Sequence, residues 1–266
     1  MHCQVFLLGE VMRFYLGTHE PSWLRKARTP LFISAVRLRR CKTMPIASVD
    51  WALDSGGFSE LSIHGLWKIS RDQYAEEVRQ WSAEIGRMEW AAIQDWMCEP
   101  FILEKTGKSV EEHQRLTIQS YKDLTATAPE IRWIPILQGF RKEEYLRHIE
   151  SYLAAGVDLK QSSVVGIGSI CRRQHTKEAE DIITTIASLG IRLHWFGFKT
   201  KGLERVSRFL VSSDSMAWSF AARRNEKDPN CQSSHKSCAN CRVYAENWAE
   251  KVNRIVKEAE AQGRLF

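Results

Sequence analysis

The stretch Trp51-Ala-Leu-Asp-Ser-Gly-Gly-Phe58 holds a short apolar run, a polar residue at its end and a glycine turn. A continuous apolar run of this kind is typical of a parallel strand that is buried on both faces. Comparable runs recur along the chain, and most of them precede an amphipathic segment. We therefore predict eight strands, at residues 13–17, 30–35, 48–54, 90–94, 131–137, 163–168, 192–198 and 211–214.

Helix signals fill four of the intervals between these strands. Ser70 with Gln73, and Ser109 with Glu112, have the spacing of a capping box. Apolar residues at helical spacing follow Ser70, and two more stripes end at a glycine, as helices often do. We predict that these stripes face the core: Tyr74, Val78, Trp81 and Ile85; Leu146, Ile149 and Leu153; Ile182, Ile183, Ile186 and Leu189.

Eight strands that alternate with helices predict an α/β fold, a closed (β/α)8 TIM-type barrel. An open doubly wound sheet is the alternative, but the turn Gly17-Thr-His-Glu-Pro21 is not the glycine-rich turn of a nucleotide-binding fold. A C-terminal helix is predicted over residues 243–262. Because no linker rich in Pro, Ser and Gly marks a boundary, residues 1–266 are predicted to form a single domain.

The composition, with 44% apolar and 26% charged residues, excludes a disordered or low-complexity chain. No apolar run approaches the ~20 residues of a membrane span, and the amino end lacks the layout of a signal peptide. We therefore expect a soluble cytoplasmic protein with no membrane partner. The net charge of +6 allows a polyanionic partner without requiring one.

Three of the seven cysteines lie close together, in the segment Cys231-Gln-Ser-Ser-His235-Lys-Ser-Cys238-Ala-Asn-Cys241. Three thiolates and one imidazole can close a tetrahedral zinc shell with no open position, which is the structural pattern. We predict a structural Zn²⁺ ion in the loop 231–241; a loop of free thiols is the alternative. A barrel hydrolase with catalytic zinc is disfavoured, because all four metal positions are filled.

Polar residues at strand ends are the candidates for chemistry, because barrel enzymes carry their reactive residues at the carboxyl ends of the strands. Asp54, Asp95 and Asp214 all follow apolar runs. One such Asp would indicate only a helix cap or a turn, whereas three at corresponding places indicate a site. Other strands end in Gln138-Gly139 and in Gly166-Ile-Gly168-Ser169, where glycine lets a backbone approach a flat ligand.

In this order along the chain, the strand ends resemble those of the tRNA-guanine transglycosylase superfamily. Its members are zinc-bearing (β/α)8 barrels that exchange a guanine in a nucleic acid for a 7-deazaguanine. Asp54-Ser55-Gly56-Gly57-Phe58 is similar to the family's Asp-Ser-Gly-Gly-Phe motif. The resemblance implies acid/base work for Asp54, the nucleophile for Asp214, and base contacts for Asp95, Ser55, Phe58, Gln138, Gly139, Gly166 and Gly168.

The opening Leu16-Gly-Thr-His-Glu-Pro21, the stretch Trp195-Phe-Gly-Phe-Lys199 and the compact metal motif resemble the branch that modifies DNA in phages and bacteria. The tRNA enzymes have a Cys-x-Cys-x2-Cys motif with a distant His, whereas His235 lies inside the cluster here. The resemblance therefore implies a DNA guanine transglycosylase that inserts a free 7-deazaguanine base (preQ0-like) through a covalent Asp–sugar intermediate. The same chemistry on tRNA and a non-catalytic zinc-stabilised nucleic-acid-binding barrel are the alternatives.

A nucleic-acid partner requires cations near the strand ends, and a target inside a duplex would have to be flipped out. Trp96 and Trp195 are candidates to stack on a base. His19, at the end of the first predicted strand, could line the pocket; a structural histidine is the favoured alternative. A homodimer or a helper protein remains open. The candidate phosphate contacts follow the last three predicted strands: Arg172, Arg173, Lys199, Lys201, Arg223 and Arg224.

Overall fold

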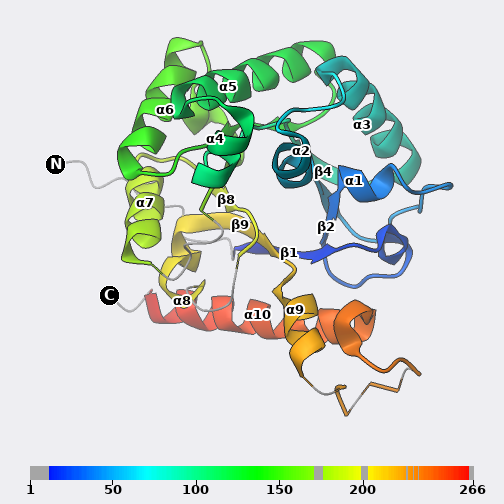
Figure 1. The fold of residues 1–266 in the computed structure, drawn as a ribbon. Helices are drawn as coiled ribbons and strands as arrows, with labels where there is room; N and C mark the ends of the chain where they lie inside the picture. Colours follow the sequence, from blue (N-terminus) through cyan, green and yellow to red (C-terminus); the bar gives the residue numbers. More distant parts are fainter. Residues whose placement is uncertain are drawn as a thin grey trace.

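A computed structural model describes residues 12–170, 176–198, 203–225, 227–229, 231–232 and 234–263. Its strands form one parallel sheet in the order β5-β4-β3-β2-β1-β9-β8-β7-β6 (Figure 1). The strands are β1 (Arg13–Thr18), β2 (Leu31–Ser34), β3 (Trp51–Asp54), β4 (Met88–Ala92), β5 (Trp133–Ile134), β6 (Ile136–Leu137), β7 (Val165–Ile167), β8 (Leu193–Trp195) and β9 (Leu210–Ser215).

The described residues contain nine strands, whereas eight are predicted. Pro135 explains the difference. It is the single residue between β5 and β6, so these two strands are halves of the strand predicted at 131–137. Proline has no N–H to donate to a sheet ladder, and its carbonyl accepts from the Gly166 amide at 2.9 Å. Since β5 pairs with β4 and β6 pairs with β7, the two edges of the sheet meet. The predicted α/β barrel is confirmed, with its fifth strand broken.

The helices cover the barrel from outside, as Figure 1 shows for the arc of α3, α5, α6 and α7. The long helix α10 packs against β1, α8 and α9, and confirms the predicted C-terminal helix. The helices are α1 (Ala35–Leu38), α2 (Gly57–His64), α3 (Arg71–Ile85), α4 (Pro100–Thr106), α5 (Val110–Thr127), α6 (Lys142–Ala154), α7 (Lys177–Ser188), α8 (Leu203–Val206), α9 (Ala217–Arg224) and α10 (Arg242–Gly263). Within the described chain, no helix is both long and apolar enough to cross a membrane.

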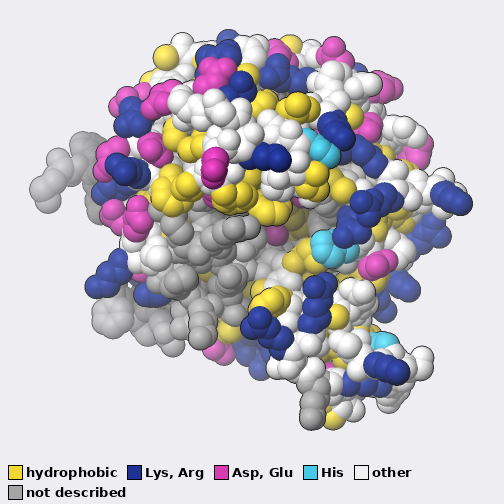
Figure 2. All heavy atoms as spheres, viewed as in Figure 1, with side chains coloured by type: hydrophobic (Ala, Val, Ile, Leu, Met, Phe, Trp, Pro, Cys, Tyr) yellow, Lys and Arg dark blue, Asp and Glu magenta, His cyan; other side chains and the backbone are white. Residues whose placement is uncertain are grey.

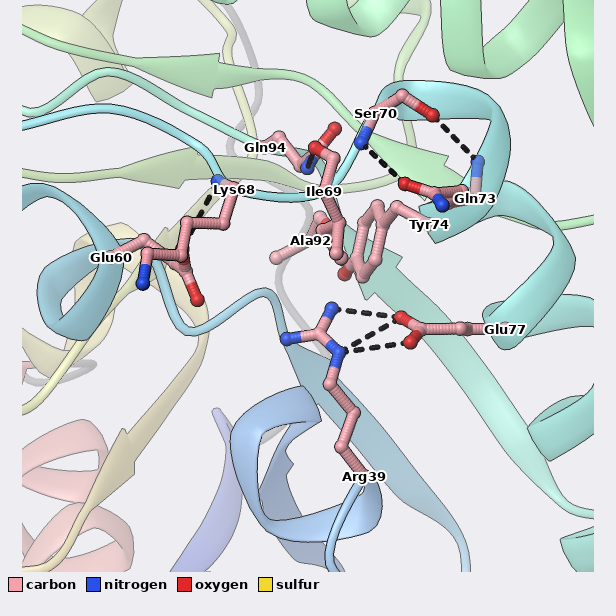
Figure 3. Close-up of polar contacts among 10 residues, drawn as sticks. All are labelled: Arg39, Glu60, Lys68, Ile69, Ser70, Gln73, Tyr74, Glu77, Ala92 and Gln94. Carbon is pink, nitrogen blue, oxygen red and sulfur yellow. Dashed lines mark hydrogen bonds and ion pairs between the residues drawn. The ribbon is translucent and has the colours of Figure 1, made fainter. Parts of the chain in front are cut away.

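The start of α3 shows how local sequence fixes a helix on the barrel (Figure 3). The Ser70 hydroxyl accepts from the Gln73 amide at 3.2 Å, and the Gln73 side chain accepts from the Ser70 amide at 3.1 Å. One residue later, the Tyr74 hydroxyl donates to the carbonyl of Ala92 in β4 at 2.8 Å. The predicted capping box is therefore confirmed, and the stripe that begins at Tyr74 is buried.

The face that α6 turns to the core differs from the prediction. Tyr145, His148 and Tyr152 are buried, whereas Leu153 is 63% exposed. The reason lies at the strand break, because the Tyr152 hydroxyl donates to the Ile136 carbonyl at 3.1 Å and lies 3.3 Å from the Ile136 amide. Side chains with polar tips satisfy backbone groups there that leucine would leave unpaired. In α7 the isoleucines of the predicted stripe are buried, but Leu189, its last member, is exposed.

Candidate active site

A cavity of about 590 Å³ opens at the carboxyl ends of the strands. Asp54 at the end of β3, Asp95 beyond β4 and Asp214 in β9 all line it. The register of parallel strands brings these distant carboxyl groups to one edge of the barrel. Figure 2 shows this face of the molecule, on which hydrophobic, cationic and histidine side chains surround a hollow.

Asp214 is positioned through one of its two carboxylate oxygens. Oδ1 accepts from the Gly197 amide at 2.9 Å and lies 3.4 Å from His194 Nε2. His194 is fully buried, its Nδ1 lies 2.8 Å from the Ser212 hydroxyl, and burial lowers its pKa. Among the described residues no hydrogen bond engages Asp214 Oδ2, so the carboxylate keeps one oxygen for a ligand.

Asp54 sits at the start of a tight turn. Its Oδ1 accepts from the Gly56 amide at 3.1 Å, and Gly56 has φ = 84°, a left-handed conformation that favours glycine. Burial raises the pKa of Asp54, hydrogen bonds from Gly56 and Ser34 oppose this, and the charge of Asp214 raises it further. A carboxyl group with a raised pKa keeps its proton to a higher pH than an ordinary aspartate, which suits it to donate a proton.

Asp95 forms the floor of the cavity together with Gln138. The Gln138 side-chain amide donates to Asp95 Oδ2, and the Ser55 hydroxyl donates to Oδ1 at 3.4 Å. Burial, followed by the charge of Asp54, raises the pKa of Asp95 to about 7. The main chain of Gln138 is fixed from behind, because the Gln114 amide donates to its carbonyl at 2.7 Å.

Glycines in β7 and just after it make room for these groups. A Cβ atom at Gly168 would collide with the Gln138 amide, and one at Gly166 would lie 2.5 Å from the ring of Phe196. Such contacts are closer than normal, so a side chain at either position would have to displace Gln138 or Phe196.

A comparison with protein families now identifies the chain. The profile of the DpdA family (DeoxyPurine in DNA protein A) matches residues 11–264. The chain belongs to the DpdA family. A comparison with curated proteins returns no match. The predicted resemblance to the DNA-modifying branch is confirmed, and membership of the DpdA family makes DNA the implied substrate of a DNA-modifying protein.

Not every predicted base contact of this DpdA-family protein lines the cavity. Gln138, Gly168 and Phe58 do, together with the three aspartates. Ser55 lies behind Asp95, and Gly139 and Gly166 lie behind the lining, next to Tyr145 and Phe196 respectively.

The aromatic candidates differ in their surroundings. Trp195 is 1% exposed and packs on Phe198, so it is wrongly predicted as a stacking platform. Trp96 faces a separate cavity between α3 and α5. Phe58 is 47% exposed at the mouth of the active-site cavity, and its ring makes an edge contact with Phe101 of α4.

The structure describes two of the six predicted phosphate-contact residues. Arg223 and Arg224 lie in the last turn of α9, with the Arg224 guanidinium 4.0 Å from the Phe220 ring centre. His19, which the sequence analysis named as a candidate for the pocket lining, lines the cavity. So do Arg37 and Arg40, which the sequence analysis did not single out. Burial lowers the pKa of His19, and the charges of Arg37 and Arg223 lower it further. Arg172, Arg173, Lys199 and Lys201 lie outside the described residues.

The predicted metal ligands are gathered between α9 and α10. The ligand atoms of Cys231, His235, Cys238 and Cys241 all lie within 4.8 Å of one another. The His235 nitrogen lies 3.3 Å and 3.4 Å from two of the sulfur atoms, and the Sγ atoms of Cys231 and Cys241 are 3.6 Å apart. Tetrahedral zinc with ordinary bond lengths separates S from N by about 3.5 Å and S from S by about 3.8 Å. The donor set therefore fits a tetrahedral ion.

Proposed function

We propose that this DpdA-family protein exchanges guanine in DNA for a free 7-deazaguanine base, preQ0-like, through a covalent sugar–Asp214 intermediate. One observation carries the proposal: Asp54, Asp95 and Asp214 line the same cavity. Its volume lies within the range of small-ligand sites. A pentosyl transfer needs three carboxyl roles, and the surroundings of the three aspartates differ in the way those roles require.

Asp214 is the nucleophile. Breaking the N-glycosidic bond builds positive charge at C1′ of the sugar, which a carboxylate on the opposite face stabilises and then captures. The Gly197 amide and His194 hold Oδ1 in place, and Oδ2 attacks. The incoming base then displaces the carboxylate and restores the glycosidic bond.

Asp54 moves the proton. The departing guanine needs a proton as its bond to C1′ breaks, and the incoming 7-deazaguanine must lose one as its bond forms. Because burial raises the pKa of Asp54, this group serves as the acid in the first step and as the base in the second.

Asp95 selects the base. As a carboxylate it accepts from the N1–H and N2–H groups of guanine, and adenine cannot supply that pair of donors. A bidentate contact of this kind discriminates by about 1–3 kcal/mol. A 7-deazaguanine presents the same edge, so one pocket takes both the leaving and the entering base.

Cations at the mouth hold the flipped nucleotide. Unstacking a base costs a few kcal/mol, which phosphate contacts offset. Arg37 and Arg40 from the region of α1, and Arg223 and Arg224 from α9, are the described candidates.

The four-residue cluster holds Zn²⁺ with a structural role. Bound zinc cross-links the loop and contributes folding free energy. The cluster is tied to the barrel, because the Ser219 hydroxyl in α9 donates to the Ala239 carbonyl at 2.8 Å, and α9 directly follows the strand that carries Asp214.

An exchange assay tests the proposal. DNA and tRNA are incubated separately with the protein and a panel of free 7-deazaguanines, and the nucleosides are then quantified by mass spectrometry. We expect a deazapurine in DNA, none with D214N, and normal exchange with the control D181N, whose parent carboxylate pairs with Lys142 on the surface. Modified tRNA would favour the alternative polymer, and DNA binding without exchange by any base would favour a non-catalytic barrel.

A further inference from the structure

A continuous row of polar contacts links the base-reading Asp95 to a second buried carboxyl group, Glu99. Asp95 Oδ2 is bonded to the Gln138 side-chain amide. Gln138 Oε1 lies 2.6 Å from the Ser169 hydroxyl, which lies 2.7 Å from Glu99 Oε2. The Cys98 backbone amide also donates to the Ser169 hydroxyl at 2.7 Å. Asp95 and Glu99 are 9% and 7% exposed, and both line the active-site cavity.

The protons in this row can be counted. Three contacts separate the two carboxyl groups. Beyond the hydrogen bond between Gln138 and Asp95, the two contacts of the Ser169 hydroxyl, at 2.6 and 2.7 Å, have the length of O–H···O hydrogen bonds. Each of the three contacts therefore needs one proton. The Gln138 amide supplies a proton at its nitrogen end only, and the Ser169 hydroxyl supplies one. Cys98 adds none, because its N–H enters from the side. Two protons cannot serve three contacts, so one carboxyl group must carry the third.

The orientation of the Gln138 amide decides which carboxyl group carries it. With the amide nitrogen toward Asp95, as in the structure, Ser169 donates to Gln138 and Glu99 must donate to Ser169. With the amide rotated by 180°, Gln138 donates to Ser169, Ser169 donates to Glu99, and Asp95 must donate to Gln138. Each arrangement uses every donor once.

We propose that Asp95 and Glu99 share one proton across Gln138 and Ser169, and that Glu99 is thereby a specificity-determining residue of the base pocket. The proposal rests on the base-reading role of Asp95 in the proposed function. With the proton on Glu99, Asp95 is a pure acceptor and matches the two N–H donors of guanine or a 7-deazaguanine. With the proton on Asp95 and donated to Gln138, the carboxyl group is neutral and accepts more weakly, so the match to the two N–H donors is weakened.

No net proton is consumed when a base binds. The proton leaves Asp95 for cavity water, Glu99 takes one up, and the Gln138 amide turns over. Both carboxyl groups line the cavity, so each can exchange its proton with cavity water. Rotation of the Gln138 amide is then the only movement of a side chain that the change requires.

The charged surroundings favour a row that holds one proton rather than none. Asp54 from β3 faces Asp95, and Tyr74 and Tyr152 approach it from α3 and α6. Glu99 lies beside the Cys98 thiol, which Glu144 and Glu111 also face. These named neighbours among the described residues are acidic or neutral, so they oppose a second negative charge in the row.

The backbone of Ser169 supports the assignment. Its φ is +56°, in the left-handed region that residues with a side chain rarely adopt. Such strain persists where the surrounding structure demands it. Here the strained turn places one hydroxyl between Gln138, Glu99 and Cys98.

Infrared difference spectroscopy of the full chain at pH 7 tests the shared proton, because a protonated carboxyl group has its own C=O stretch. Relative to the wild type, we expect E99Q to lose one carboxylic-acid band and D95N to lose one. The double variant should also lose one band and not two, because the two groups share a single proton. In E99Q the new amide donates to Ser169, so Asp95 no longer needs a proton. E99A replaces E99Q if that variant does not fold, and E112Q, on the surface beside Arg115, is the control.

Two results would overturn the proposal: no band lost in either single variant, or two bands lost in the double variant, which would indicate independent acids. Titration with free 7-deazaguanine adds a functional readout. E99Q should bind at least as tightly as wild type between pH 6 and 8, whereas a purely structural Glu99, or one needed for its charge, predicts weaker binding. D95N should bind at least about tenfold more weakly; unchanged binding by D95N would refute the base-reading role itself, whatever the band count.

Discussion

Asp95 couples the base pocket to the stability of the fold. Its pKa is raised to about 7, chiefly by burial, against about 3.9 in an unfolded chain. The folded state binds this proton more tightly than the unfolded chain, so protonation of Asp95 stabilises the fold. The stabilisation is complete below pH 3.9 and is lost as pH rises through 7. Integrated over that interval, it reaches up to about 4 kcal/mol.

The first prediction concerns D95N. Its free energy of unfolding should change less between pH 5 and pH 8 than that of the wild type, because an amide does not titrate. Urea unfolding at the two pH values measures the difference. Equal pH dependence in both proteins would show that Asp95 does not titrate in this range.

Gly168 gives a second test at the level of one residue. In G168A the new Cβ would displace the Gln138 amide, so base affinity should fall by at least about tenfold as one bidentate contact is lost. Calorimetric titration with 7-deazaguanine measures it. The matched control is G190A, which is strained by its φ of 83° but has open space around it; it should lose stability and keep its affinity. Normal affinity in G168A would contradict the described pocket.

Among the elements, the broken fifth strand depends on the polar face of α6. Y152F removes the hydroxyl that serves both backbone groups of Ile136, and an unsatisfied buried group costs about 1–3 kcal/mol. We expect this loss in urea unfolding. Y121F, which alters a half-buried tyrosine of α5, should cost less; equal losses would mean that the strand break needs no cap.

The strands and the strand-end aspartates could be predicted because short apolar runs and the residue that ends each run are local features. The face of α6 could not, since Tyr145, His148 and Tyr152 contact backbone groups of Gly168, Gln138 and Ile136, and only the folded barrel brings those groups to this helix. The Glu99 carboxyl group and the Ser169 hydroxyl, as distinct from the predicted turn that ends at Ser169, were missed for a related reason. Each lies beyond the end of a strand, where a polar residue is typical of any loop. Only the closed barrel brings the two side chains together. Arg37 and Arg40 follow strand two, so the strand-end rule that pointed to His19 after strand one could have found them as well.

At the scale of the whole molecule, the metal loop joins α9 and α10 to the barrel. We propose that all three belong to one domain. If so, removing the metal with a chelator, or replacing a ligand as in C238S, should lower the stability of the entire chain in one transition. Metal analysis together with thermal unfolding checks this. A barrel that melts normally while only α10 becomes protease-sensitive would indicate separate units.

The distribution of arginines predicts how the molecule holds DNA. Arg37, Arg40, Arg223 and Arg224 have no carboxylate partner among the described residues, unlike Arg205, which pairs with Glu180. Replacing the first four by glutamine should flatten the slope of log affinity against log salt by about 0.9 for each lost phosphate contact. R205Q should leave the slope unchanged. An unaltered slope in the fourfold variant would remove these residues from the interface.

The central claim is that Asp214 forms a bond to the sugar, and trapping that bond tests it most directly. The protein is mixed with a guanine-containing oligonucleotide, denatured with acid and analysed by mass spectrometry after digestion. We predict a sugar adduct on the peptide that contains Asp214, absent in D214N and discharged when a free 7-deazaguanine is added before denaturation. An adduct on Asp54, or base exchange by D214N at the wild-type rate, would contradict the account.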